Sequence, residues 1–135
     1  MQLMPLSADA HELLGLLAHL YLENNRPEKS VILLQALDAV GLASHRDNVT
    51  LALSLLRTSK PEAAMDVLDR LALNGAVDAP FHLIRSQTLH ALDRHAEAYT
   101  AMQAYIDLRV LNHADPIPQQ SSRNAHKTPA AGTPA

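Results

Sequence analysis

Similar residues return every 34 positions along this chain. Cationic side chains recur at this spacing, at Arg26, Lys60 and Arg94. Two further slots hold only small side chains: Ala18, Ala52 and Ser86 in the first, and Ser30, Ala64 and Ala98 in the second. Larger apolar side chains keep the same step at Tyr21, Leu55 and Leu89, and at Leu34, Leu68 and Met102. A period of this length indicates a tandem array of one supersecondary unit.

Small side chains are needed where two helices of one unit approach most closely. A 34-residue unit with small residues at two fixed slots is typical of the tetratricopeptide repeat (TPR), which is a helix hairpin. One hairpin cannot bury its apolar face alone, so neighbouring hairpins must stack. The sequence therefore predicts an all-α fold of three tandem TPR-like hairpins in an α-α superhelix. The predicted domain covers residues 9–113, with repeats at about 11–44, 45–78 and 79–112.

Start and stop signals divide each repeat into two helices. Ser44 with Asp47 fits a capping box, as does Asp9 with Glu12. Gly41 can end a helix because it accepts a left-handed backbone. We expect six helices, bounded by Asp9 and about Asn24, Pro27 and Gly41, Ser44 and about Thr58, Pro61 and Asn74, Asp78 and about Leu92, and Asp93 and about Asn112.

Residues 114–135 are rich in Pro and Ala and have almost no large apolar side chain, which predicts a disordered tail.

Composition excludes several classes of function. The net charge of −3 gives no electrostatic footprint for nucleic acid. The chain has no cysteine and no apolar run long enough to insert into a membrane. The first 14 residues carry no Lys or Arg, so a secretory signal is not expected and the cytoplasm is the simplest location.

Catalytic and metal-binding chemistry is not expected either. Eight histidines are present, but His11 and His19 are eight residues apart, as are His82 and His90. Neither pair has the i, i+4 spacing of a helical zinc site. There is no Gly-rich phosphate loop and no nucleophile elbow. We therefore predict that the chain is not an enzyme and that it has no catalytic residues, cofactor or metal.

The first helix is apolar on nearly every side. Between Leu13 and Leu22, only Gly15, Ala18 and His19 interrupt large apolar side chains. A helix of this kind must be covered on more than one side. Three interpretations stay open: the free chain forms a homodimer through this helix, a partner covers it, or residues 1–6 fold back over it.

Binding is predicted on the concave face, which the first helix of each hairpin lines. The 34-residue period places the following partner-binding residues there: Leu16, His19, Leu22, Val49, Thr50, Leu53, Leu56, Arg57, Leu83, Ile84, Gln87 and His90. An apolar floor with a polar rim suits an amphipathic helix or an extended apolar segment. The cationic clamp with which some TPR domains hold a carboxylate is missing, since its slots hold residues such as Gly15, Thr50 and Ile84.

Two segments carry a resemblance to a known family. Residues 28–37 read EKSVILLQAL, and residues 98–109 read AYTAMQAYIDLR. With these segments, the chain resembles the small type III secretion chaperones of Gram-negative bacteria, and most of all the SctY (YscY) family. The resemblance covers about residues 10–116, and the Pro/Ala-rich tail departs from it.

The resemblance implies a partner and a role. Proteins of this family bind a small secreted protein, SctX, in the cytosol, and the pair engages the export gate SctV. Two alternatives stay open: another type III chaperone, for the needle subunit or for translocators, and a generic TPR scaffold. A translocator chaperone would need more helix after Asn112, where this chain becomes Pro-rich instead.

Overall fold

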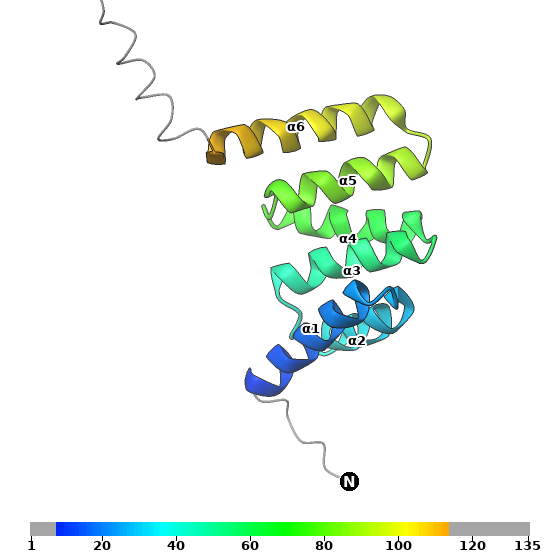
Figure 1. The fold of residues 1–135 in the computed structure, drawn as a ribbon, viewed down its shortest axis with the longest axis vertical. Helices are drawn as coiled ribbons and strands as arrows, with labels where there is room; N and C mark the ends of the chain where they lie inside the picture. The colour runs from blue at the N-terminus through cyan, green and yellow to red at the C-terminus, as the bar shows by residue number, and fades with distance from the viewer. Residues whose placement is uncertain (1–7, 114–135) are drawn as a thin grey trace, which may run out of the picture.

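The computed structural model describes residues 8–113 of the chain, and in this range it is all-α. Sequential helices pack as antiparallel pairs, which confirms the predicted three hairpins (Figure 1). The hairpins follow one another in a stack, with α1 and α2 at one end and α6 at the other. The helices are α1 (Ala8–Glu23), α2 (Pro27–Ala39), α3 (His45–Arg57), α4 (Pro61–Leu73), α5 (Ala79–Ala91) and α6 (His95–His113).

The small side chains of the 34-residue period are buried, as expected for close contacts between helices. All six residues of the two small slots are buried: Ala18, Ala52, Ser86, Ser30, Ala64 and Ala98. Large leucines of α2 and α4, among them Leu34 and Leu68, fill the space beside them. Because these residues belong to one continuous cluster, the hairpins share a single core.

A buried hydroxyl pair joins the first two hairpins. The Ser54 hydroxyl of α3 lies 3.0 Å from the Ser30 hydroxyl of α2 and 2.8 Å from the Thr50 carbonyl oxygen. In the third hairpin, the buried Thr88 hydroxyl donates to the Ile84 carbonyl oxygen at 2.8 Å. Small hydroxyl side chains at this slot allow a first helix to approach the helix before it, while their polar atoms stay satisfied.

Five turns of the described chain use the same backbone device. A residue in the left-handed region follows the helix, and the next N–H donates to a carbonyl five residues back, as in the Schellman motif. Gly41 does this between the first two hairpins, as predicted, and Gly75 does it between the second and third. Within the hairpins the residues are Asn25, Ser59 and Asp93, again 34 positions apart. The sequence analysis missed these three because none of them is glycine.

Most predicted helix limits are confirmed. Ser44 and Asp47 form the expected capping box, and Pro27 and Pro61 open their helices. Asp9 as the first N-cap was wrong, because α1 already includes Ala8 and Asp9 stands in its first turn. The predicted disordered tail, residues 114–135, lies outside the described residues.

Candidate functional site

The first helices of the hairpins form one continuous row. Helix α3 directly contacts both α1 and α5, so a surface can run across all three. Nine of the predicted binding residues remain accessible on it, wholly or in part: Leu16, His19, Thr50, Leu53, Leu56, Arg57, Leu83, Gln87 and His90. We call these nine residues the binding face. Four of the nine are leucines, and the other five are polar or charged.

Three predicted binding residues were wrong. Leu22, Val49 and Ile84 are buried, and Val49 and Ile84 belong to the shared core. Val49 lies on α3, which packs directly on both α1 and α5, and Ile84 lies on α5. They support the binding face from below and cannot contact a partner.

A hollow of about 370 Å³ opens between α1 and α3. Most of its lining side chains carry a polar group. Its lining includes Leu16, His19 and Thr50 of the binding face and adds His11, Glu12, Gly15, Ser44, Arg46 and Asp47. His19 also lies 3.0 Å from a carboxylate oxygen of Glu23 on the next turn. A ligand segment here would meet one apolar contact and several hydrogen-bonding groups.

Gly15 sets the distance between the two walls of this hollow. A Cβ atom at this position would lie 2.7 Å from a carboxylate oxygen of Asp47, which is too close. Glycine inside a helix costs about 1 kcal/mol relative to alanine. With any larger residue at this position, the Asp47 side chain at the start of α3 would have to shift.

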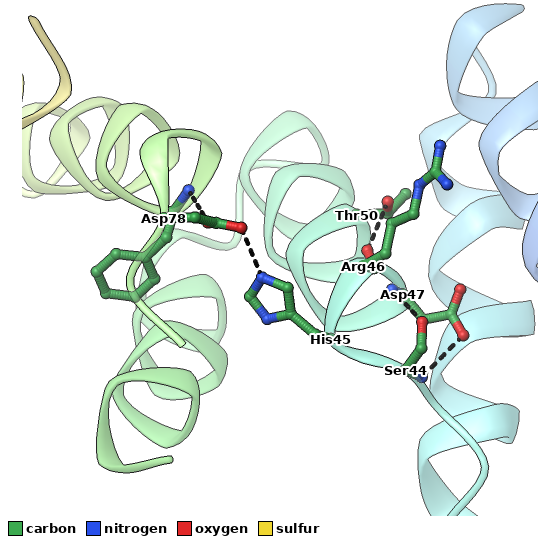
Figure 2. Close-up of polar contacts among 7 residues, drawn as sticks. Ser44, His45, Arg46, Asp47, Thr50 and Asp78 are labelled. Carbon is green, nitrogen blue, oxygen red and sulfur yellow. Dashed lines mark hydrogen bonds and ion pairs between the residues drawn. The ribbon is translucent and has the colours of Figure 1, made fainter. Parts of the chain in front are cut away.

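A polar contact fixes the starts of α3 and α5 relative to each other. The Nε2 atom of His45, the first residue of α3, lies 2.8 Å from a carboxylate oxygen of Asp78 (Figure 2). The other carboxylate oxygen accepts from the Phe81 N–H and so caps α5. Asp78 is thus shared between two repeats, and it holds one edge of the row of first helices in place.

The environment of Asp78 favours its charged form. Burial acts against the charge, but the hydrogen bonds from His45 and from the Phe81 backbone outweigh it and lower the pKa of the carboxyl. The sequence analysis missed the pair with His45. A signal was present, since Ser44 and Asp78 occupy the same slot of the period and both cap first helices.

An exposed leucine stripe runs along α1. We call it the α1 stripe; it comprises Leu13, Leu16, Leu17 and Leu20, with exposed fractions of 63, 55, 38 and 44%. Leu16 belongs to the binding face as well. The stripe agrees with the expectation that this helix has more apolar surface than the array covers. Helix α1 belongs to the hairpin at one end of the stack (Figure 1).

Among the described residues, the other end of the stack also exposes large apolar side chains. On α6, Tyr99, Ile106 and Val110 are exposed. A hollow of about 440 Å³ beside them is lined by Ser86, Gln87, His90, His95, Ala98, Tyr99 and Met102. The equivalent slots of α2 and α4, such as Val31 and Met65, are buried because a following hairpin covers them.

Residues 8–113 contain neither a metal-binding cluster nor a membrane-spanning helix. In this range no three His, Asp, Glu or Cys side chains are close enough to hold a metal ion together. None of the helices there is both long and apolar enough to cross a bilayer.

No protein-family model matches this chain, and no curated protein is significantly similar to it in sequence. The resemblance to the SctY family consequently stays an expectation that rests on residues 28–37 and 98–109. The geometry of the binding face bears on function independently of that resemblance.

Proposed function

We propose that this chain is a type III secretion chaperone of the SctY kind. It binds a small secreted SctX-like protein in the cytoplasm and presents it to the export gate SctV. The observation that supports this proposal is the binding face. Its residues Leu53, Leu56 and Leu83 are partly accessible and lie in the row formed by the three first helices. The residue resemblance supplies the identity of the partner and of the gate.

The arrangement suits one helical segment of a partner better than an extended charged one. The accessible leucines come from successive first helices, so an amphipathic helix lying across the row can contact all of them. Arg57, Gln87 and His90 lie exposed beside them and can pair with polar groups at the margins of such a helix. The mixed signs of charge around the hollow, with Glu12, Asp47 and Arg46, do not favour a strongly acidic or basic ligand.

Holding such a segment has a clear physical benefit. An amphipathic helix exposes its apolar face when it is separated from its assembly, and exposed apolar patches promote aggregation. A chaperone that covers this face keeps the secreted protein soluble until export.

The test is coexpression with an SctX-like protein, followed by affinity purification and light scattering. We expect a stable complex with the full chain. Leu53→Glu should abolish it, because a carboxylate would be buried against the partner's apolar face. Leu53→Ala should weaken it without placing a charge in the contact. Ile32→Glu on the exposed side of α2 is the matched control and should bind normally.

Circular dichroism and thermal melting must accompany the binding data, since Leu53 also packs against the core. A folded Leu53→Glu variant that still binds would show that the binding face is not the contact. If the wild-type chain is folded but does not copurify, the SctX assignment is wrong. Binding of a needle subunit or a translocator would then support another type III chaperone, and binding of neither would favour a generic scaffold.

A further inference from the structure

We propose that the α1 stripe is a homodimer interface, in which α1 of one copy packs antiparallel on α1 of a second copy. The two-fold axis passes between Leu16 and Leu17. This inference does not depend on the proposed function. Because Leu16 belongs to both surfaces, the dimer would compete with any partner for that residue.

The spacing of the stripe is that of a helix–helix seam. Leu13, Leu16, Leu17 and Leu20 stand at steps of three and four residues and cover an arc of about 100° around the helix. On the same side of the helix, the polar residues Asp9 and Asn24 lie before and after the four leucines. The patch is therefore long enough for one helix to lie along it, and it ends in polar groups that can remain hydrated.

The fold itself shows that this side of a first helix is normally covered. Leu51 occupies the slot of Leu17 one repeat later and is 2% exposed, against 38% for Leu17. Ser54 occupies the slot of Leu20 and is 0% exposed, against 44% for Leu20. In the later repeats the preceding second helix provides the cover. No helix of the described chain precedes α1, so its cover must come from elsewhere.

The other uncovered end of the array is a poor candidate for that cover. At the slot of closest approach, α3 and α5 carry Ser54 and Thr88, which fit against Ser30 and Ala64 of the preceding helices. Helix α1 carries Leu20 there. If α6 of a second copy took the place of a preceding helix, Leu20 would meet Ala98 where only a small side chain fits. Head-to-tail stacking is thus disfavoured by sterics.

A second α1 accommodates the leucines, because the stripe is self-complementary. Around the two-fold axis Leu13 faces Leu20 of the other copy, and Leu16 faces Leu17. Helix α1 contains three acidic residues and no Lys or Arg, so the relative direction of the helices matters. In the antiparallel arrangement Asp9 lies opposite Asn24, and Glu23 lies opposite Ala10. A parallel arrangement would place like charges and like helix dipole ends together.

Size-exclusion chromatography with multi-angle light scattering tests the inference on the full chain over a wide range of concentrations. We expect twice the mass of one chain for the wild type. Leu13→Glu should raise the dissociation constant by about tenfold or more, because it buries a carboxylate against leucine. Leu13 is mostly exposed, so this variant should keep its fold by circular dichroism. Adding Leu20→Lys should restore the dimer, since positions 13 and 20 face each other across the axis.

The controls separate this interface from the alternatives. Ile32→Glu on α2 and Tyr99→Glu on α6 should leave the dimer intact. A wild-type chain that is monomeric at every concentration would overturn the proposal, and the stripe would then be covered by the chain's own first residues or by another protein. A dimer dissociated by Tyr99→Glu and not by Leu13→Glu would overturn it in favour of the α6 end. Failure of the double variant to rescue would contradict the antiparallel register.

Discussion

At the residue scale, side-chain volume at a few positions decides how the helices meet. Ala64 shows this most simply, since it is fully buried at the contact of α4 with its neighbours. Its counterparts Ser30 and Ala98 are buried in the same slot of the other repeats. The two serines of the first contact, Ser30 and Ser54, satisfy each other. Polarity at this slot is therefore tolerated, whereas added volume is not.

Ala64→Leu should destabilise the domain by about 1 to 3 kcal/mol, because the extra carbons overpack the close contact. Urea unfolding followed by circular dichroism measures this. Ala72→Leu, at an exposed position of the same helix, is the matched control and should unfold near the wild-type midpoint. A midpoint for Ala64→Leu at or above the wild type would contradict the repeat alignment.

Asn48 marks a local defect in the core. Its side-chain oxygen is buried and has no hydrogen-bond partner, whereas the same slot of the first repeat holds Leu14 packed against the core. An unsatisfied buried acceptor costs about 1 to 3 kcal/mol. Asn48→Leu should therefore raise the urea midpoint, while Asn74→Leu on the exposed end of α4 should not. A lower midpoint for Asn48→Leu would mean that the slot cannot accept the larger side chain.

His82 should make stability depend on pH. Burial, and then the charge of Arg85, lower the pKa of its imidazole below the ordinary 6.5. The unfolded chain therefore takes up a proton at a higher pH than the folded chain. This contribution to stability is complete above pH 6.5 and is lost as the pH falls through the folded-state pKa. Melting temperatures should show a smaller acid-side decline for His82→Gln, and identical declines would refute the role of His82.

At the element scale, helix ends are specified by local chemistry of two kinds. Capping residues such as Ser44 could be identified from the sequence because their side chains act over three residues. The left-handed turns at Asn25, Ser59 and Asp93 could not, because glycine is the usual signal and these residues adopt that conformation less readily. Their regular spacing shows that the repeat geometry imposes the turn on whichever residue stands there.

Ser44→Ala should cost about 1 kcal/mol, because it removes the acceptor for the Asp47 N–H at the start of α3. Ser44→Asn should be nearly neutral, since asparagine caps helices equally well. The free energy of unfolding from urea titration distinguishes them. Equal losses for both variants would indicate that the hydroxyl acts in some other way than as a cap.

At the scale of the whole molecule, the 34-residue period was enough to predict the hairpins, their order and the small-residue contacts. The period was not enough to distinguish accessible apolar side chains from buried ones. Leu53 and Val49 lie one turn apart on α3, yet only Leu53 is accessible, because direct packing of α3 on α1 and α5 covers Val49. The contact of His45 with Asp78 also depends on how two repeats dock, which no local pattern records.

Protection against hydrogen exchange should be greatest in the middle of the array. Helices α3, α4 and α5 have neighbours on both sides, whereas α1 and α6 end the stack. Stability in such arrays follows nearest-neighbour contacts, so the ends open more easily. Hydrogen exchange with mass spectrometry should therefore find faster exchange in α1 and α6. Slowest exchange in either end helix would contradict this.

Stacking of neighbours also determines how the chain reaches its fold. Contacts in the described array join helices that are close in sequence, which gives a low contact order and folding times on the order of microseconds to milliseconds. During synthesis, each hairpin can form as soon as its second helix has emerged. The apolar slots of α2 and α4 stay open only until the next first helix arrives. Helix α6 has no such successor among the described residues, so within that range no following first helix covers its apolar face.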